Sequence, residues 1–562
     1  MEVLQGVTVL TMTERQATAE AVAFDENGIL AVGRSDHVLA QAGPSARVRT
    51  LEGHAVVPGF VDAHHHFSTA VLFQGTVNCR PGAVFSIGDI QRRFRRAAED
   101  IPPGSWVVGY GYDQSRLAEK RYPTRQDLDA ACGDRPAVLV HYSFHELVAS
   151  TRALELARIG RSTPDPVGGR IERSAFGLGL PTGRLVETAQ GPVERLAWEA
   201  LLASLGDNLL DSIARYERSL FACGITLVND PTVSPDIELL FQRARAAGKL
   251  HMPVVMMPVG DTGYLCPPWD RLEGRPTGEG SHDLSIGPLK VFFDGGETCA
   301  VCLSPQQAIG TLGRAVAMSW TQRTLTPLGN LRRTPFRMGA DLRLHAGARY
   351  HADDNAASAL VERAVERGFA VAIHAIGNSA VAQAAEALGR VRGYHRDIPP
   401  PRIEHAILLE KDQPLRLAQA GLSVVTQPWF LSLFSPSLVP PLHGLRVLPL
   451  RTLMDRGVHV AGSSDAPVGQ VAPLEAIRMA VSREISGGVF VEPDEAIDAY
   501  RALAMYTREG ARVSGCLHRV GTIEPKKRAD LVILSHDPRA PKTLGDVRVV
   551  ETVLNGRTVY PD

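Results

Sequence analysis

The sequence predicts an α/β protein whose main body is a closed (β/α)8 barrel of the TIM type. Eight apolar segments, each bounded by polar residues or glycine, alternate with helical patterns, and such alternation is typical of parallel sheets covered by helices. Short β-like segments lie at both ends of the chain, and neither group is large enough to bury a core of its own. The length of 562 residues exceeds one simple core and favours a large domain with additions.

The two ends of the chain are expected to form one small β-sandwich domain, from residues 1–55 and 515–562. Near the N-terminus, Asn27-Gly28 favours a hairpin turn between two short strands. A second Asn-Gly pair at 555–556 favours the same arrangement near the C-terminus. The intervening residues 56–514 then form the barrel and its insertions.

Eight strand candidates define the barrel. They are Val56–Ala63, Ile225–Asn229, Pro253–Pro258, Pro288–Phe293, Ala370–Ile373, Arg402–His405, Leu422–Thr426 and Val458–Gly462. Several connections between them carry a helical pattern of apolar residues. These are Pro235–Ala247, Asn355–Arg367, Ser379–Val391, Lys411–Ala420 and Leu448–Arg456.

Two connections are too long for a simple barrel. Residues 68–218 contain extra strand and helix candidates, so we expect an inserted cap after the first barrel strand. Residues 301–352 show little pattern, and loops of this length are usually lids or disordered. A basic lid would favour an anionic substrate, whereas the alternative is a solvated loop or one between subunits. The segment has one acid, Asp341, and seven arginines: Arg314, Arg323, Arg332, Arg333, Arg337, Arg343 and Arg349.

Composition and charge exclude several classes of function. Hydrophobic residues make up 44% and charged residues 22%, and a net charge of -1 gives no basis for binding nucleic acid or an anionic membrane. No apolar run approaches the roughly 20 residues of a membrane helix, and Met1–Met12 lacks the pattern of a signal peptide. Seven scattered cysteines fit a reducing cytoplasm, and the lone Cys299-x-x-Cys302 pair is expected to be chance spacing. We therefore expect a cytoplasmic protein that acts on a small molecule. Barrels of this size often form homodimers, but the sequence marks no interface.

Three consecutive histidines end the first barrel strand. Because alternate side chains of a strand share a face, His64 and His66 point one way and His65 the other. Two imidazoles on one face are a ready grip for a divalent metal. The alternative is a polar strand end with solvated histidines. His65 is expected to pack or to support the other two.

Other strands end in residues of the same chemical type. The fifth strand ends at His374, the sixth at His405 and the eighth at Asp465, and in a barrel these ends meet at one face. A lone strand-end histidine is more often structural. Four histidines and an aspartate at the same end of four strands instead match the ligands of a hydrolytic zinc-type site.

Lys290 lies within the fourth apolar strand, where a lysine is costly to bury unless it is neutralised or paired. One solution is reaction with CO₂ to give a carbamate, an anionic ligand that can bridge two metals. The alternative is an ion pair with a neighbouring acid such as Asp294 or Asp230.

A set of motifs along the chain resembles one family. The motifs are Pro-Gly-Phe-Val-Asp-Ala-His-x-His from Pro58, the strand lysine before Phe-Asp-Gly, His-Ala-Ile-Gly from His374, Arg-Ile-Glu-His-Ala from Arg402 and Gly-Ser-x-Asp-Ala-Pro from Gly462. Together they resemble the amidohydrolase superfamily, and within it the YtcJ-like (amidohydrolase 3) proteins, which include N-substituted formamide deformylases. The resemblance spans nearly the whole chain and is specific for fold and family, but not for substrate.

The resemblance implies a metal centre with one or two divalent ions, for which zinc is expected. His64 and His66 would hold one ion and His374 and His405 the other. A carboxylated Lys290 would bridge them, and Asp465 would bind metal and transfer protons.

The implied reaction is hydrolysis of a non-peptide C–N bond in an amide or an N-formyl or N-acyl amine. Metal-activated hydroxide would attack the carbonyl carbon, with Asp465 as general base and then general acid. His145 in the cap would contact the substrate, against the alternative of a structural histidine. Rival functions on the same metal site are a cyclic amide or imide hydrolase, a deaminase and a decarboxylase. A non-catalytic ligand-binding relative is the remaining alternative.

Overall fold

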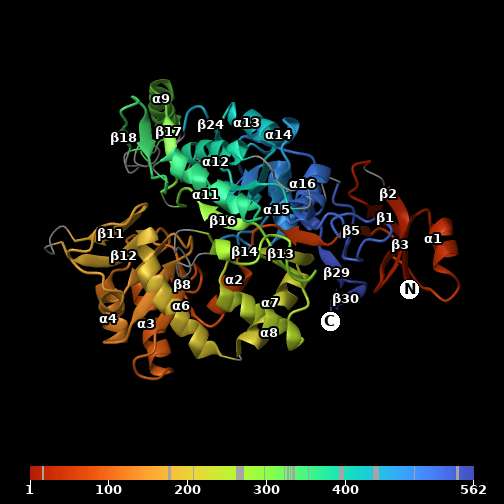
Figure 1. The fold of residues 1–562 in the computed structure, drawn as a ribbon, viewed down its shortest axis with the longest axis horizontal. Coiled ribbons are helices and arrows are strands. Elements are labelled where there is room, and N and C mark those ends of the chain that lie inside the picture. Colours follow the sequence, from red (N-terminus) through yellow and green to blue (C-terminus); the bar gives the residue numbers. More distant parts are fainter. Residues whose placement is uncertain are drawn as a thin grey trace.

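The protein is an α/β structure built around parallel strands (Figure 1). In the part of the chain that the structure describes, no helix is both long and apolar enough to cross a membrane. The computed structural model describes residues 1–15, 18–174, 179–206, 208–260, 271–296, 298–321, 323, 325, 328, 331, 336–351, 353–391, 398–433, 442–485, 488–539 and 544–561.

The two ends of the chain supply one mixed sheet of eight strands, on the right in Figure 1. Strand β5 from the N-terminal part pairs antiparallel with β28 from the C-terminal part, with Leu531 opposite Pro58. Apolar side chains of both parts, such as Leu4 and Val553, share one buried cluster, so neither part is covered without the other. The elements are β1 (Glu2–Leu10), β2 (Thr18–Asp25), β3 (Gly28–Gly33), α1 (Ser35–Ala42), β4 (Arg47–Thr50), β5 (Ala55–Pro58), β28 (Leu531–Leu534), β29 (Val549–Leu554) and β30 (Arg557–Tyr560).

The centre of the molecule holds two parallel sheets. The first runs in the order β6, β13, β14, β15 and the second in the order β16, β20, β21, β23, β25. The strands are β6 (Phe60–Asp62), β13 (Ile225–Val233), β14 (Val254–Pro258), β15 (Leu284–Ile286), β16 (Leu289–Phe292), β20 (Val371–Ala375), β21 (Arg402–His405), β23 (Ser423–Thr426) and β25 (Val460–Gly462).

The two parallel sheets contact each other at both edges. A parallel bridge joins Val259, just after β14, to Lys290 of β16. At the other edge the backbone N–H of Ala63 donates to the carbonyl of Gly462 at 3.4 Å, which links the end of β6 to β25. Seven of the eight predicted strands lie in these sheets, and β15 is an additional short strand directly before β16. The first prediction, Val56–Ala63, was wrong in extent: its first half is β5 of the terminal sheet, and only its second half, β6, belongs to the parallel sheets.

Helices between the strands cover the parallel sheets. Helix α8 illustrates why the sequence forms them: Ser234 Oγ accepts from the Ile237 N–H at 3.2 Å, Pro235 occupies the first turn, and Arg243 and Arg245 lie in the last turn. The helices are α7 (Asn208–Phe221), α8 (Pro235–Ala246), α11 (Asp354–Glu366), α12 (Asn378–Arg390), α13 (Gln413–Gln419), α14 (Leu450–Asp455), α15 (Pro473–Ser482), α16 (Ala499–Tyr506) and α17 (Arg508–Val513). Two short antiparallel pairs accompany them: β22 (Leu408–Glu410) with β24 (Leu445–Val447), and β26 (Glu484–Ile485) with β27 (Val489–Phe490).

The segment after β6 forms a separate six-stranded sheet with its own apolar clusters, at the lower left of Figure 1. The last part of this segment forms two helices, α6 and α7, because Gly206 ends the first. The elements are α2 (Phe67–Phe73), β7 (Val77–Asn78), α3 (Ile87–Glu99), β8 (Val107–Tyr112), α4 (Arg125–Cys132), β9 (Ala137–His141), β10 (Glu146–Ala149), α5 (Thr151–Leu156), β11 (Gly169–Arg173), β12 (Pro181–Glu187) and α6 (Gly191–Leu205).

Residues 301–352 differ from the patternless loop that the sequence predicts. They contain β17 (Val301–Leu303), α9 (Pro305–Thr321), β18 (Arg337–Met338) and β19 (Leu344–Ala346), and the three strands form one antiparallel sheet. Gly310 and Gly313 lower the helix propensity of α9, which explains why its sequence reads weakly as a helix. Of the seven arginines in this segment, Arg332 and Arg333 lie outside the described residues.

Candidate metal centre

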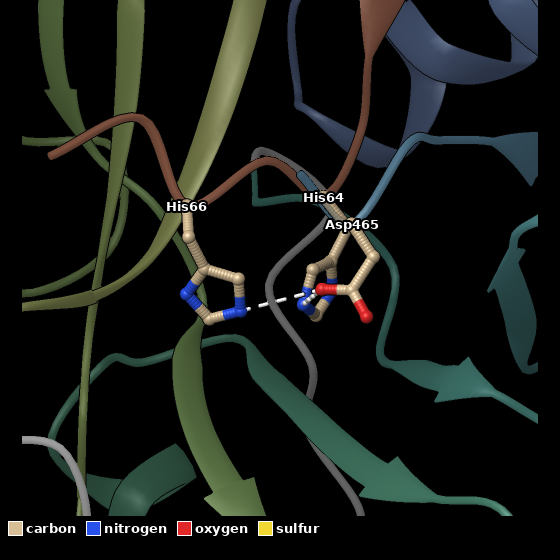
Figure 2. A group of neighbouring side chains, drawn as sticks. All are labelled: His64, His66 and Asp465. Atoms are coloured by element: carbon tan, nitrogen blue, oxygen red, sulfur yellow. Dashed lines mark ion pairs between the residues drawn. The ribbon is translucent and has the colours of Figure 1, made fainter. Parts of the chain in front are cut away.

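Three of the predicted ligands meet where β6 and β25 end. Asp465 Oδ1 lies 3.3 Å from His64 Nε2 and 3.3 Å from His66 Nε2 (Figure 2). One ligand atom from each of the three residues lies within 4.8 Å of the others. His64 and His66, in the segment that follows β6, therefore both face Asp465 at the end of β25.

The other three predicted ligands lie beside this group. The ring centroid of His405, at the end of β21, lies 5.0 Å from the ring centroid of His64. It lies 4.5 Å from the ring centroid of His374, at the end of β20. Lys290 Nζ, from β16, is 3.5 Å from His64 Nε2. The ends of five parallel strands thus bring all six predicted residues to one place.

The electrostatics of these residues fit a divalent metal. Burial lowers the pKa of His64 and His374 well below the ordinary value and that of His405 to about 4, so the imidazoles are neutral donors. Burial alone would raise the pKa of Asp465, but the contacts with His64, His66 and His405 outweigh this effect and lower the pKa below its ordinary value. Asp465 is therefore a carboxylate. His374 Nε2 is buried and has no hydrogen-bond partner among the described residues, as expected for an atom aimed at an ion. Neutral imidazoles and a carboxylate are the donor set that zinc-type ions take.

Buried partners fix the far sides of two imidazole rings. Glu404 Oε2 lies 2.5 Å from His64 Nδ1, and Gln427 Oε1 lies 2.9 Å from His405 Nδ1. Each of these contacts engages Nδ1 and leaves the Nε2 atom of the histidine facing the centre. Proteins commonly orient metal-binding histidines in this way. Glu404 is itself held by the fully buried Arg402, whose Nε donates to Glu404 Oε1 at 2.7 Å.

His65 points away from the other two histidines, as the strand pattern predicts. Its Nδ1 lies 2.9 Å from Asp62 Oδ2 and 3.1 Å from Ser464 Oγ, and its Nε2 lies 3.0 Å from the Tyr216 hydroxyl. His65 therefore links the end of β6 to the loop after β25 that carries Asp465.

Lys290 does not pair with either of the acids that the sequence offered as alternatives. Asp294 accepts the backbone N–H groups of Ala300, Ile376 and Gly377 instead, and burial raises its pKa to about 7. Asp230 accepts the backbone N–H of Ser68 at 3.0 Å. Burial lowers the pKa of Lys290 to about 8, consistent with an amine whose charge is poorly compensated.

A cavity of about 440 Å³ opens onto these residues, and His145, directly before β10, lines it. The ring centroids of His145 and His374 lie 5.6 Å apart. Its Nδ1 is 2.7 Å from Glu187 Oε2, and the Tyr350 hydroxyl donates to the same carboxylate oxygen at 2.8 Å. Gly296 allows this packing, because a Cβ at Gly296 would lie 2.2 Å from the His145 ring.

The cavity wall is mostly apolar. No arginine from the described part of residues 301–352 lines it; Arg343 and Arg349 instead pair with Glu410 and Asp354. The apolar lining residues are Phe144, Phe292, Val301, Phe336, Ala346, Ile376, Leu408, Phe430, Leu433, Leu442 and Val468.

Comparisons with known proteins agree with this geometry. The model of the amidohydrolase family matches residues 47–560. The chain is 31% identical to the N-substituted formamide deformylase of Arthrobacter pascens, over 99% of this chain and 97% of that protein. It is 27% identical to the putative amidohydrolase YtcJ of Bacillus subtilis (strain 168), over 99% of this chain and 98% of the relative.

The fold is also found in a solved structure. The crystal structure of an uncharacterized metal-dependent hydrolase from Pyrococcus horikoshii superimposes with a TM-score of 0.67, at 22% identity, over 96% of this chain and 98% of that one. The family match covers most of the chain, including every strand that supplies a candidate ligand. The chain therefore belongs to the amidohydrolase family and is a hydrolase of carbon–nitrogen bonds.

Proposed function

We propose that the protein hydrolyses the C–N bond of N-formyl or N-acyl amines that carry an apolar substituent. The observation that carries this proposal is the convergence of four histidines, Lys290 and Asp465 at the base of a largely apolar cavity. The two parallel sheets, which contact each other at both edges, are best described as one closed (β/α)8 barrel. Residues 1–55 with 515–562 then form a small β domain, and residues 68–218 a cap over the barrel.

His64 and His66 would hold one ion together with Asp465, and His374 and His405 would hold a second. Nitrogen and carboxylate donors of this kind favour zinc. A carboxylated Lys290 would add an anionic oxygen between the two positions, and its Nζ already lies 3.5 Å from His64 Nε2. A divalent ion bound there lowers the pKa of water toward neutrality and polarises a carbonyl oxygen.

Asp465 performs the proton transfers in this proposal. Its Oδ1 faces both His64 and His66, so the carboxylate can orient the attacking water and accept its proton. The same carboxylate returns the proton to the leaving nitrogen as the tetrahedral intermediate collapses. An amine needs this proton because its anion is a very poor leaving group.

The cavity residues support the choice of substrate. The walls are phenylalanine, leucine, valine and isoleucine side chains, which suit an apolar N-substituent better than an anionic one. His145 would contact the substrate from the cap side, held in place by Glu187. The relative from Arthrobacter pascens is a deformylase of N-substituted formamides, which supports formamides as the first substrates to test.

The cysteines support a location in the cytoplasm. The six that the structure describes are all free thiols, as expected in a reducing compartment.

Turnover of a substrate panel by the wild-type protein and Asp465→Asn tests the proposal. The panel contains N-alkyl and N-benzyl formamides, the matching acetamides, a cyclic imide, an aminopurine and a benzoic acid. We expect formamide hydrolysis by the wild type, and about a 10²–10⁴-fold lower kcat in the variant with metal content retained. Unchanged kcat in the variant would refute the role of Asp465. Turnover confined to the imide, the aminopurine or the benzoic acid would move the function to a cyclic amide hydrolase, a deaminase or a decarboxylase.

A further inference from the structure

A second group of metal-ligand side chains lies on the three-stranded sheet of β17, β18 and β19, at the upper left of Figure 1. Cys302 of β17 lies directly opposite His345 of β19 in the antiparallel register. Asp341 lies between β18 and β19, four residues before His345. The fold therefore joins a thiol, an imidazole and a carboxylate that are separated by up to 43 residues.

The distances between these atoms are close to those around a tetrahedral ion. Cys302 Sγ is 3.9 Å from His345 Nε2, and His345 Nε2 is 3.1 Å from both carboxylate oxygens of Asp341. A tetrahedral zinc with its usual bond lengths places sulfur about 3.6 Å from nitrogen and nitrogen about 3.4 Å from oxygen. One ligand atom from each of the three residues lies within 4.8 Å of the others.

The surrounding backbone and charges are compatible with a bound cation. Gly339 has no side chain where a Cβ would lie 2.4 Å from Asp341 Oδ1 and 2.8 Å from His345 Nε2. Burial raises the pKa of the Cys302 thiol, and the charge of the nearby Arg343 offsets part of this rise. Arg343 is itself paired with Glu410 at 3.4 Å. A site with a thiolate, a carboxylate and a compensated arginine is anionic enough to hold a divalent ion.

We propose that Cys302, His345 and Asp341 form a second metal site, which takes a zinc-type ion with water as the fourth ligand. On binding, the Cys302 thiol releases its proton to solvent and the sulfur bonds to the ion. The site is structural and separate from the hydrolytic centre. Val301 and Ala346, the neighbours of Cys302 and His345 along their strands, line the substrate cavity, so the ion fixes a wall of that cavity from its outer side.

Cobalt loading tests the site, because only a thiolate ligand gives an intense sulfur-to-Co²⁺ charge-transfer band, and none of the six residues proposed to form the hydrolytic centre is a cysteine. The full-length protein is stripped with a chelator, reloaded with Co²⁺ and compared with Cys302→Ser and Cys132→Ser. Cys132 is a buried thiol of α4 in the cap and serves as the matched control. We expect the band in the wild type and Cys132→Ser, and its loss in Cys302→Ser together with one equivalent of bound metal.

Asp341→Asn is a second variant that does not disturb the core, since Asp341 is exposed. We expect it to weaken cobalt binding at this site about 10-fold or more, measured from the charge-transfer band. A wild-type protein without the band, or a band that survives in Cys302→Ser, would overturn the proposal. Equal cobalt affinity of the band in the wild type and Asp341→Asn would remove the aspartate from the site. Loss of formamide hydrolysis in Asp465→Asn has no effect on the band, so the two proposals fail independently.

Discussion

Replacing Gln427 by methionine should weaken metal binding without unfolding the protein. Gln427 is fully buried, and its Oε1 lies 2.9 Å from His405 Nδ1. The bond leaves Nε2 of His405 free to face the proposed ions. Methionine has a similar length and volume, so the change removes the polar atoms with little loss of packing.

The size of the effect follows from the contacts that are lost. Removing a hydrogen-bond partner of a metal-binding histidine typically costs about 10- to 100-fold in metal affinity, or about 1.4–2.8 kcal/mol. Gln427 Nε2 also donates to Ser463 Oγ at 2.8 Å, so the fold loses about 1 kcal/mol for this second bond. The free energy of metal binding should therefore decrease by more than the free energy of unfolding of the metal-free protein.

Metal affinity is measured by competition with a chromogenic chelator, and the thermal midpoint of the metal-free protein is recorded in parallel. Gln413→Met is the matched control, because Gln413 is also buried and hydrogen-bonded through both side-chain ends, to the backbone of Glu410 and Asn378. We expect wild-type metal affinity in the control. Equal metal affinity of Gln427→Met and Gln413→Met would refute the assignment of His405 as a ligand oriented by Gln427.

Two further predictions concern substrate binding and acid stability. Gly296→Ala should raise KM about 10-fold or more with metal content unchanged, because the new Cβ would lie 2.2 Å from the ring of His145 and displace that ring. The control Gly160→Ala should leave KM unchanged, because no atom lies within 4 Å of its new Cβ. Equal KM values for the two variants would contradict the role of His145 in substrate binding. Burial alone would raise the pKa of Glu509, but its hydrogen bonds with His459 and two arginine side chains lower that pKa to about 2. The carboxylate therefore stabilises the fold above pH 4.5, and this contribution is lost as the pH falls toward 2. Glu509→Gln should therefore be less stable at pH 7, by up to about 3 kcal/mol, and the difference in thermal midpoint from the wild type should shrink between pH 4.5 and 2; a constant difference would contradict this assignment.

The strand ends were readable because the signal is local. An apolar run followed at once by His64 or His374 identifies a buried strand and the residue at its end within one short window of sequence. The α/β class and the amidohydrolase family were predicted correctly on this basis. The metal-binding roles of the six residues stay predictions, although the structure brings them together.

The segment of residues 301–352 shows where local reading fails. Its helix α9 contains Gly310 and Gly313 and exposes large apolar side chains such as Trp320, so neither propensity nor burial pattern identified it. The arginines of this segment left open a basic lid for an anionic substrate beside a solvated or intersubunit loop, and those that the structure describes do not line the cavity. Charge in a sequence does not reveal which side of a sheet or helix it occupies.

The sequence by itself determined which residue types end the parallel strands, and its motifs indicated the family and the class of reaction. Only the tertiary structure decided how those residues are held: Glu404 orients His64 across 340 positions, Gln427 orients His405, and Glu187 holds His145. It also placed Cys302 opposite His345, whereas the sequence offered only the Cys299-x-x-Cys302 pair, whose spacing was expected to be due to chance. These contacts arise when distant segments pack, and a hydrogen bond between distant residues leaves no periodic or local trace in the chain.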